Sequence, residues 1–188
     1  MALTVFEVDN GLLRPTITRV PRTAAVAGAA LAALGIHAPV SIADGTATVA
    51  LDQATQDEQA EIVYTLTQFP TIERVDVAGR KRLTRDDFAS YVPPILIESP
   101  AAGAEVRTTF RVSGTASVFE ATLVVQAVRG GTVLEKQTAT ASEGAPGRGT
   151  FAATLHATAG PATIQVFSPS AADGSPQHEV DVAVTVAP

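Results

Sequence analysis

The side chains that could do chemistry in this sequence are carboxylates, hydroxyls and three histidines, because the chain contains no cysteine. Disulfides, thiolate metal sites and thiol nucleophiles are therefore excluded. His37, His156 and His178 are scattered along the chain and lack the short spacing that usually brings zinc ligands together. The sequence therefore predicts no catalytic, cofactor-binding or metal-binding residue.

Four acidic residues in the first half invite comparison with a calcium site or a catalytic carboxylate pair: Asp52, Asp57, Glu58 and Glu61. Calcium loops place oxygen ligands at alternating positions around a glycine-bearing turn, a pattern that is absent here. Thr55 and Glu58 instead have the spacing of a capping box, in which each side chain satisfies a free amide at the start of a helix. We interpret the cluster as the start and the solvent-exposed face of a helix.

Motifs for serine hydrolases and for phosphate binding are also missing. No GxSxG occurs, and Ser113-Gly114 lies within a predicted strand. The glycine-rich stretch GAPGRG at residues 144–149 lacks the GK[ST] ending of a phosphate loop and precedes a predicted strand. We interpret it as a turn.

The pair Phe119-Glu120 separates two strand-like stretches and is the candidate partner-binding site. A buried Phe119 could plug the end of a β-sandwich core where the chain crosses between sheets, with Glu120 facing solvent or accepting backbone amides. Alternatively, an exposed Phe119 could anchor a partner. We favour the buried corner.

Composition restricts the remaining function classes. Apolar residues make up 46% and charged residues 17% of the chain, as in globular proteins, and the net charge is −6. Nucleic-acid binding is not expected, because the longest basic block is the triplet at residues 80–82 and phosphates require a basic face. The longest apolar run, residues 24–34, is shorter than the roughly 20 residues of a membrane helix. We expect a soluble chain that reaches a membrane only through an anchor of a longer parent.

The first half mixes strands and helices. Strands are predicted at residues 3–8, 13–20 and 72–77. Helices are predicted at residues 24–34 and from Asp52 or Thr55 to residue 69. Thr23 is expected to cap the first helix and Gly35 to end it. Between the helices, Asp44-Gly45 predicts a two-residue hairpin turn.

That hairpin has a predicted register. With Asp44-Gly45 at the turn, Ile42 faces Ala47 and Val40 faces Val49, so the apolar side chains of both strands lie on one side.

From Ile95 onward the sequence consists of short alternating stretches separated by turn residues. About seven strands within roughly 95 residues predict an immunoglobulin-like β-sandwich. It has no cysteine pair or tryptophan, so its core must rest on aliphatic packing. We expect two domains: an α+β domain with a mixed or antiparallel sheet and two helices at residues 1–90, and the sandwich at residues 91–188.

Several blocks in order resemble a bacterial domain pair: the sporulation and spore-germination domain GerMN, followed by the immunoglobulin-like domain of spore-germination proteins. In the first half they are ADGTATVALD (43–52), EIVYTLTQFPTIERVDV (61–77) and LTRDDF (83–88). In the second half they are PPILIESPAAGAEV (93–106), RVSGTASVFEATL (111–123), RGTF (148–151) and the final EVDVAVTV. One departure is the connection between Leu34 and Val40, which is shorter than in the family.

The resemblance implies an extracytoplasmic location, often on a lipoprotein or membrane-anchored parent. It implies a role in envelope or spore assembly and a first domain similar to ring-building domains. It brings no catalytic residues and no cofactor.

Three functions follow as hypotheses. The first is a noncatalytic envelope module that binds an envelope protein or peptidoglycan. The second is a self-assembling scaffold, that is, a homo-oligomer. The third, an enzyme that hydrolyses wall polymers, is the one that the sequence favours least, because no carboxylates pair convincingly.

Overall fold

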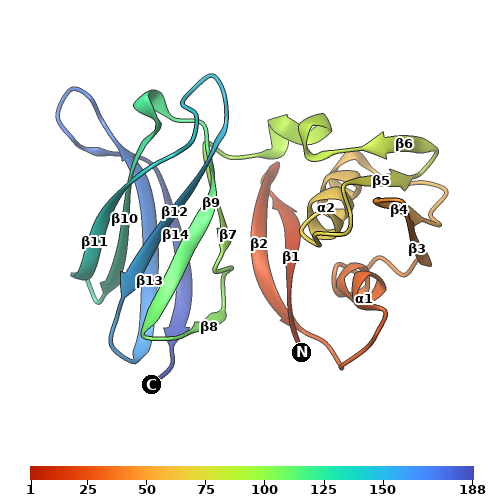
Figure 1. Ribbon diagram of the computed structural model, residues 1–188, viewed down its shortest axis with the longest axis horizontal. Helices are drawn as coiled ribbons and strands as arrows, with labels where there is room; N and C mark the ends of the chain where they lie inside the picture. Colours follow the sequence, from red (N-terminus) through yellow and green to blue (C-terminus); the bar gives the residue numbers. More distant parts are fainter. The chain divides into compact units, whose positions relative to one another are not determined.

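The computed structural model describes residues 1–188, and the chain forms two compact units, residues 1–93 and 94–188 (Figure 1). The first unit mixes strands and helices, and the second is built of strands. None of the helices has both the length and the apolar character needed to cross a membrane.

The first unit contains six strands, two α-helices and a 3₁₀ segment. Its elements are β1 (Ala2–Asp9), β2 (Leu12–Arg19), α1 (Val26–Ala33), β3 (Val40–Ala43), β4 (Thr46–Val49), α2 (Gln56–Leu66), β5 (Arg74–Val77), β6 (Arg80–Leu83) and η1 (Arg85–Tyr91). β1 and β2 form an antiparallel pair. The other four strands form a sheet in the order β3-β4-β5-β6, in which β4 and β5 are parallel.

Helix α2 holds the β1–β2 pair in the first unit. The hydroxyl of Thr65 accepts a hydrogen bond from the Phe6 amide at 2.9 Å, and the rings of Phe6 and Tyr64 lie 5.7 Å apart. Ile62 and Leu66 on the same helix are fully buried. One face of α2 therefore packs against the β1–β2 pair.

The N-terminal ends of the two helices are set by residues close to them in the sequence. The capping box of α2 is confirmed, because the Glu58 amide donates to Thr55 Oγ1 at 3.2 Å and the Thr55 amide donates to Glu58 Oε2 at 2.7 Å. The predicted cap of α1 is wrong. The Thr23 hydroxyl accepts from the Ala25 amide at 3.0 Å in a turn, and the helix begins later, at Val26.

Gly35 ends α1 as predicted. It has a left-handed φ of 80°, its amide donates to the Ala32 carbonyl, and the Ile36 amide donates to the Leu31 carbonyl. This pair of bonds is the Schellman arrangement that closes a helix C-terminus.

The β3–β4 hairpin also has its predicted register. Val40 pairs with Val49 and Ile42 pairs with Ala47. The turn residues Asp44 and Gly45 both have positive φ, 48° and 73°, as a type I′ turn requires.

The second unit is a sandwich of two sheets. Its elements are β7 (Ile95–Ser99), β8 (Ala104–Val106), β9 (Thr109–Ala116), η2 (Phe119–Ala121), β10 (Thr122–Arg129), β11 (Thr132–Thr140), β12 (Gly149–His156), β13 (Gly160–Pro169) and β14 (Pro176–Val186). One sheet has the order β11-β10-β13-β14-β8 and the other the order β12-β9-β7. Between them lies a core that is largely aliphatic, with fully buried members such as Val112, Leu123, Val125, Leu155 and Ile164.

A carboxylate joins the edges of the two sheets. Glu135 on β11 accepts a hydrogen bond from the backbone amide of His156 on β12. This bond, followed by one from the Gln137 side chain, lowers the pKa of the Glu135 carboxyl.

We expect Glu135→Gln to make the sandwich less stable at pH 7 than wild type. A folded-state pKa below the ordinary 4.5 stabilises the fold above that value, and this stabilisation is lost as the pH falls through the lowered pKa. Urea unfolding at pH 7 and pH 3 measures it: the difference between the two proteins should shrink at low pH. Glu105→Gln, at the one exposed position of β8, is the control, because no hydrogen bond from another strand to this side chain is seen, and the difference from wild type should not change with pH.

Gly114 on β9 is required for a close approach of two strands. A Cβ built there would lie 1.9 Å from the Leu96 carbonyl oxygen of β7, which is backbone and cannot move aside freely. The β7–β9 register shifts near this point, between Ile97 and Ser99.

We therefore expect Gly114→Ala to destabilise the second unit by about 1–3 kcal/mol, because the added methyl group forces β7 and β9 apart. Urea unfolding measures the change. The matched control is Gly28→Ala on α1, where no atom lies within 4 Å of the new Cβ. Alanine should raise helix stability there by about 0.5–1 kcal/mol. An unchanged unfolding curve for Gly114→Ala would contradict this account.

Candidate functional site

The candidate site lies at one end of the sandwich, where the chain passes from β9 to β10. These strands belong to different sheets, so the segment from 117 to 121 is the predicted crossing between them. Two further connections, β11–β12 and β13–β14, lie at the same end of the unit (Figure 1).

The predicted burial of Phe119 is wrong. Its side chain is 70% exposed, whereas Val118 before it is only 3% exposed. Val118 and Ala121 belong to the hydrophobic core of the sandwich and fill this end of it. The structure therefore corresponds to the alternative in which Phe119 projects into solvent.

The backbone explains why Phe119 points outward. Glu120 has φ 54° and ψ 13°, and Ala121 also has φ 54°, so two successive residues with side chains are left-handed. This conformation is uncommon outside glycine and costs free energy. It persists only where the surroundings hold it in place, and such strained residues cluster at functional sites.

Hydrogen bonds to neighbouring segments hold this turn. The amides of Ala121 and Ala145 both donate to the Val118 carbonyl, at 3.2 and 2.9 Å. The Ala141 amide donates to the Ala121 carbonyl at 2.8 Å, and the Thr122 hydroxyl donates to the Glu120 carbonyl at 3.2 Å. The turn is therefore rigidly connected to the β11–β12 loop.

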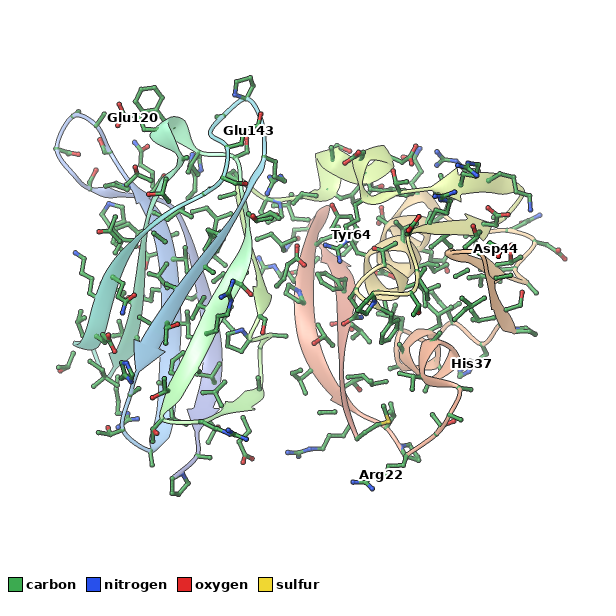
Figure 2. The ribbon with its side chains drawn as sticks, in the orientation of Figure 1. Arg22, His37, Asp44, Tyr64, Glu120 and Glu143 are labelled. Carbon is green, nitrogen blue, oxygen red and sulfur yellow. The ribbon has the colours of Figure 1, made fainter.

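The β11–β12 loop packs closely against the turn. A Cβ on Gly144 would lie 3.1 Å from the Ala121 amide nitrogen, and one on Gly147 would overlap the Glu143 carboxyl at 1.9 Å. The glycines of GAPGRG thus allow close contact as well as turning. Glu120 and Glu143 lie at the same end of the unit, where Figure 2 labels both. The glycine spacing of GAPGRG indicates a turn, but nothing in the sequence places this loop against residues 118–121.

The β13–β14 hairpin completes this end. Its turn is closed by bonds between Ser170 and Ser175 and between Gly174 and Ser170, each 2.8 Å long. Asp173 accepts hydrogen bonds from the Ser175 hydroxyl and amide, and these lower the pKa of its carboxyl. We call the three connections (residues 117–121, 142–148 and 170–175) the loop end.

The acidic cluster of the first unit serves the fold. Besides the cap formed by Glu58, Asp57 accepts a hydrogen bond from the Tyr91 hydroxyl at 2.8 Å, and Glu61 accepts one from the Val8 amide at 2.8 Å. Burial raises the pKa of the Glu61 carboxyl. The interpretation is confirmed for the helix start, where Glu58 caps α2 and Asp57 is exposed in the first turn. Glu61, however, is partly buried against β1 rather than on the solvent-exposed face, and Asp52 lies before the helix.

The histidines lie apart, His37 in the connection between α1 and β3, His156 on β12 and His178 on β14. No group of three or more metal-binding side chains is placed to hold an ion. Of the three imidazole rings, only that of His156 makes a hydrogen bond: its Nδ1 lies 2.8 Å from Thr109 Oγ1. Glu135 accepts its hydrogen bond from the backbone amide of His156 and not from the imidazole ring. Thr109, His156 and Glu135 therefore do not form the relay of nucleophile, base and acid that a catalytic triad needs.

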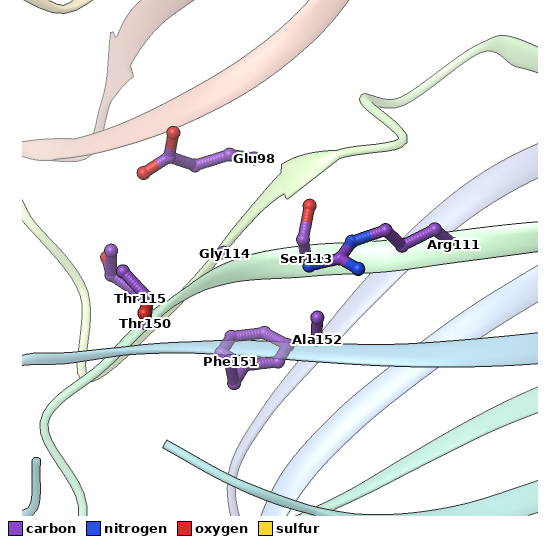
Figure 3. A pocket seen from close by; sticks show the side chains of 8 residues that line it. All are labelled: Glu98, Arg111, Ser113, Gly114, Thr115, Thr150, Phe151 and Ala152. Carbon is purple, nitrogen blue, oxygen red and sulfur yellow. The ribbon is translucent and has the colours of Figure 1, made fainter. Parts of the chain in front are cut away.

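A polar groove of about 400 Å³ lies on the outer face of the β12-β9-β7 sheet (Figure 3). Its lining includes Glu98, Arg111, Ser113, Thr115 and Thr150. The hydroxyl of Thr115 accepts a hydrogen bond from Arg148 at 3.2 Å. These side chains can bind polar groups, but no nucleophile and base lie in contact there.

The comparisons with known proteins bear on the second unit. No curated protein matches the chain. A family model does match it over residues 94–175, a range that contains the whole loop end and stops before β14. Residues 94–175 are thus similar to Gmad2, the immunoglobulin-like domain of bacterial spore germination.

Proposed function

We propose that this protein is a noncatalytic, extracytoplasmic envelope module and that the loop end of its second unit binds a protein partner. The observation that carries the proposal is Phe119, a large apolar side chain 70% exposed on a turn held in a strained conformation. Aromatic residues of this kind commonly supply much of the binding energy in protein interfaces.

The rigidity of the turn favours binding by Phe119. Because neighbouring loops fix the backbone of residues 118–121, little conformational freedom remains to be lost when a partner covers the ring. Glu120 follows Phe119 in the chain, and Glu143 lies at the same end of the unit (Figure 2). A partner surface with an apolar pocket and basic residues around it would complement this arrangement.

The family match supports a role connected with spore germination. The matched residues are similar to an immunoglobulin-like domain of spore germination, and the loop end lies within them. The resemblance of the first half to GerMN, the extracytoplasmic location and an anchored lipoprotein parent remain predictions from the sequence, and we include them in the proposal.

Peptidoglycan is the other partner class. The polar groove beside Ser113 and Thr115 offers hydroxyl groups of the kind that bind sugars. The only aromatic side chain in its lining, Phe151, is buried in the core and gives a sugar ring no stacking platform. The exposed ring and the acidic residues on the three connections of the loop end, Glu120, Glu143 and Asp173, favour a protein.

We expect Phe119→Ala to leave the free energy of unfolding within about 0.5 kcal/mol of wild type, since the ring is mostly exposed. The same substitution should weaken partner binding by about tenfold or more. Urea unfolding measures the first effect. Biolayer interferometry against purified extracytoplasmic proteins and peptidoglycan sacculi of a spore-forming bacterium measures the second.

Two variants serve as controls. Val133→Ala removes a side chain that is 48% exposed on β11, outside the loop end, and should retain binding. Val118→Ala removes a core side chain and should lower stability instead. Equal binding by wild type and Phe119→Ala, or no binding of wild type to any of these probes, would refute the proposed role.

A further inference from the structure

Strand β3 leaves one side of its backbone without a strand partner. It lies at the edge of the β3-β4-β5-β6 sheet. The Ala50 amide donates to the Pro39 carbonyl, so Pro39 and every second residue after it, Ser41 and Ala43, direct their backbone groups toward β4. The amides and carbonyls of Val40 and Ile42 therefore point away from the sheet.

The two edges of this sheet differ in how well they are protected against pairing with a strand of another molecule. The opposite edge, β6, carries Arg80, Lys81 and Arg82, has a register shift against β5, and holds Arg82 at φ 58°. Charges and irregularities of this kind prevent edge-to-edge pairing. β3 has the sequence Val-Ser-Ile-Ala, with no charge and no proline. Only β3 is thus suited to receive another strand.

An apolar groove adjoins β3. It has a volume of about 510 Å³ and is lined by the start of α1, residues 38–40 with Ile42, and residues 69–72, none of which is charged. Val40 and Ile42 lie on the same face of the hairpin as the buried Ala47 and Val49, yet Ile42 is 48% exposed. The core of the first unit therefore remains open along this edge.

We propose that a second copy of this chain pairs with this edge, β3 against β3 in antiparallel orientation, with the twofold axis at Ser41. In this register Val40 of each copy faces Ile42 of the other, and each pair exchanges two hydrogen bonds. All four outward-pointing groups of each strand are then satisfied. A register shifted by two residues along either strand would pair Val40 or Ile42 with residues outside β3 and lose half of these bonds.

Charge placement at the ends of β3 agrees with this pairing. The exposed His37 precedes the strand and the exposed Asp44 follows it (Figure 2). Antiparallel pairing centred on Ser41 places Asp44 of one copy beside the segment 37–38 of the other. Each carboxylate then lies near a histidine rather than near another acid.

The apolar groove supplies the burial that a four-residue strand pair lacks by itself. Val40 and Ile42 of the incoming copy lie on the core-facing side of the extended sheet, next to the open groove. The contact is isologous, because the same surface is used by both copies, so it produces a closed dimer. It deepens the self-assembly hypothesis and is independent of the loop end.

Sedimentation equilibrium of the full chain over a concentration series tests the dimer. We expect a monomer–dimer equilibrium for wild type, and for Ile42→Lys a dissociation constant at least about tenfold higher, because a charge would enter the apolar contact. Val133→Lys is the matched control: Val133 is also 48% exposed on an edge strand, but in the second unit, and its dimerisation should equal that of wild type. Phe119→Ala should also dimerise as wild type, which separates this test from that of the proposed function.

Cysteine crosslinking tests the register, since the natural chain has no cysteine. Ser41 would face its own copy in a non-hydrogen-bonded pair with Cα atoms about 4.5 Å apart, a distance that permits a disulfide. Under mild oxidation Ser41→Cys should form a covalent dimer rapidly. Thr48→Cys, the exposed partner of Ser41 on the inner strand β4, should not.

Three results would overturn the proposal. They are a wild-type chain that stays monomeric up to about 1 mM, an Ile42→Lys variant that dimerises as well as wild type, and crosslinking of Ser41→Cys no faster than that of Thr48→Cys.

Discussion

The loop end of the second unit depends on the crossing of the chain between its two sheets. β9 ends at Ala116 and β10 begins at Thr122, so five residues must change sheets. Packed sheets lie about 10 Å apart, and five extended residues span roughly 17 Å, so the crossing has room for a tight turn. Val118 fills the core on the way across, and Ala121 lies at the start of the next strand. Between them the backbone turns through two left-handed residues, and the side chain of Phe119 is left outside.

The same crossing explains why the sequence predicted the turn but not its exposed ring. A larger apolar side chain gains more free energy from burial, and Phe119 is much larger than Val118, so the sequence predicts that Phe119 lies in the core. The outcome depends instead on the φ angles of Glu120 and Ala121, which nothing in their residue types indicates, because neither is glycine or asparagine. Non-local bonds from Ala141 and Ala145 impose these angles, and a single sequence does not reveal them.

Features that depend on neighbouring residues were predicted more accurately. The hairpin around Asp44-Gly45 fixes its own register, and the Thr55–Glu58 capping box involves one helix turn. Thr23 failed as a cap even though it is a good capping residue, because its hydroxyl closes a turn onto Ala25 instead. The proximity of the GAPGRG loop to the crossing joins residues more than twenty positions apart, and the edge position of β3 depends on the order of the whole sheet. Both lie beyond what local pattern shows.

The two proposed surfaces lie in different units of the same chain, so each can be occupied without blocking the other. A dimer formed through β3 carries two loop ends. Once the first loop end has bound a partner that has repeated sites, binding of the second loop end is intramolecular. Linked binding of this kind raises overall affinity by roughly 10²–10⁴ without a new contact, if the geometry lets both sites engage. A weak anchor based on one phenylalanine and a weak strand pair would then reinforce each other wherever copies of the chain are concentrated. Strong binding at either surface alone is not required for such a module to work.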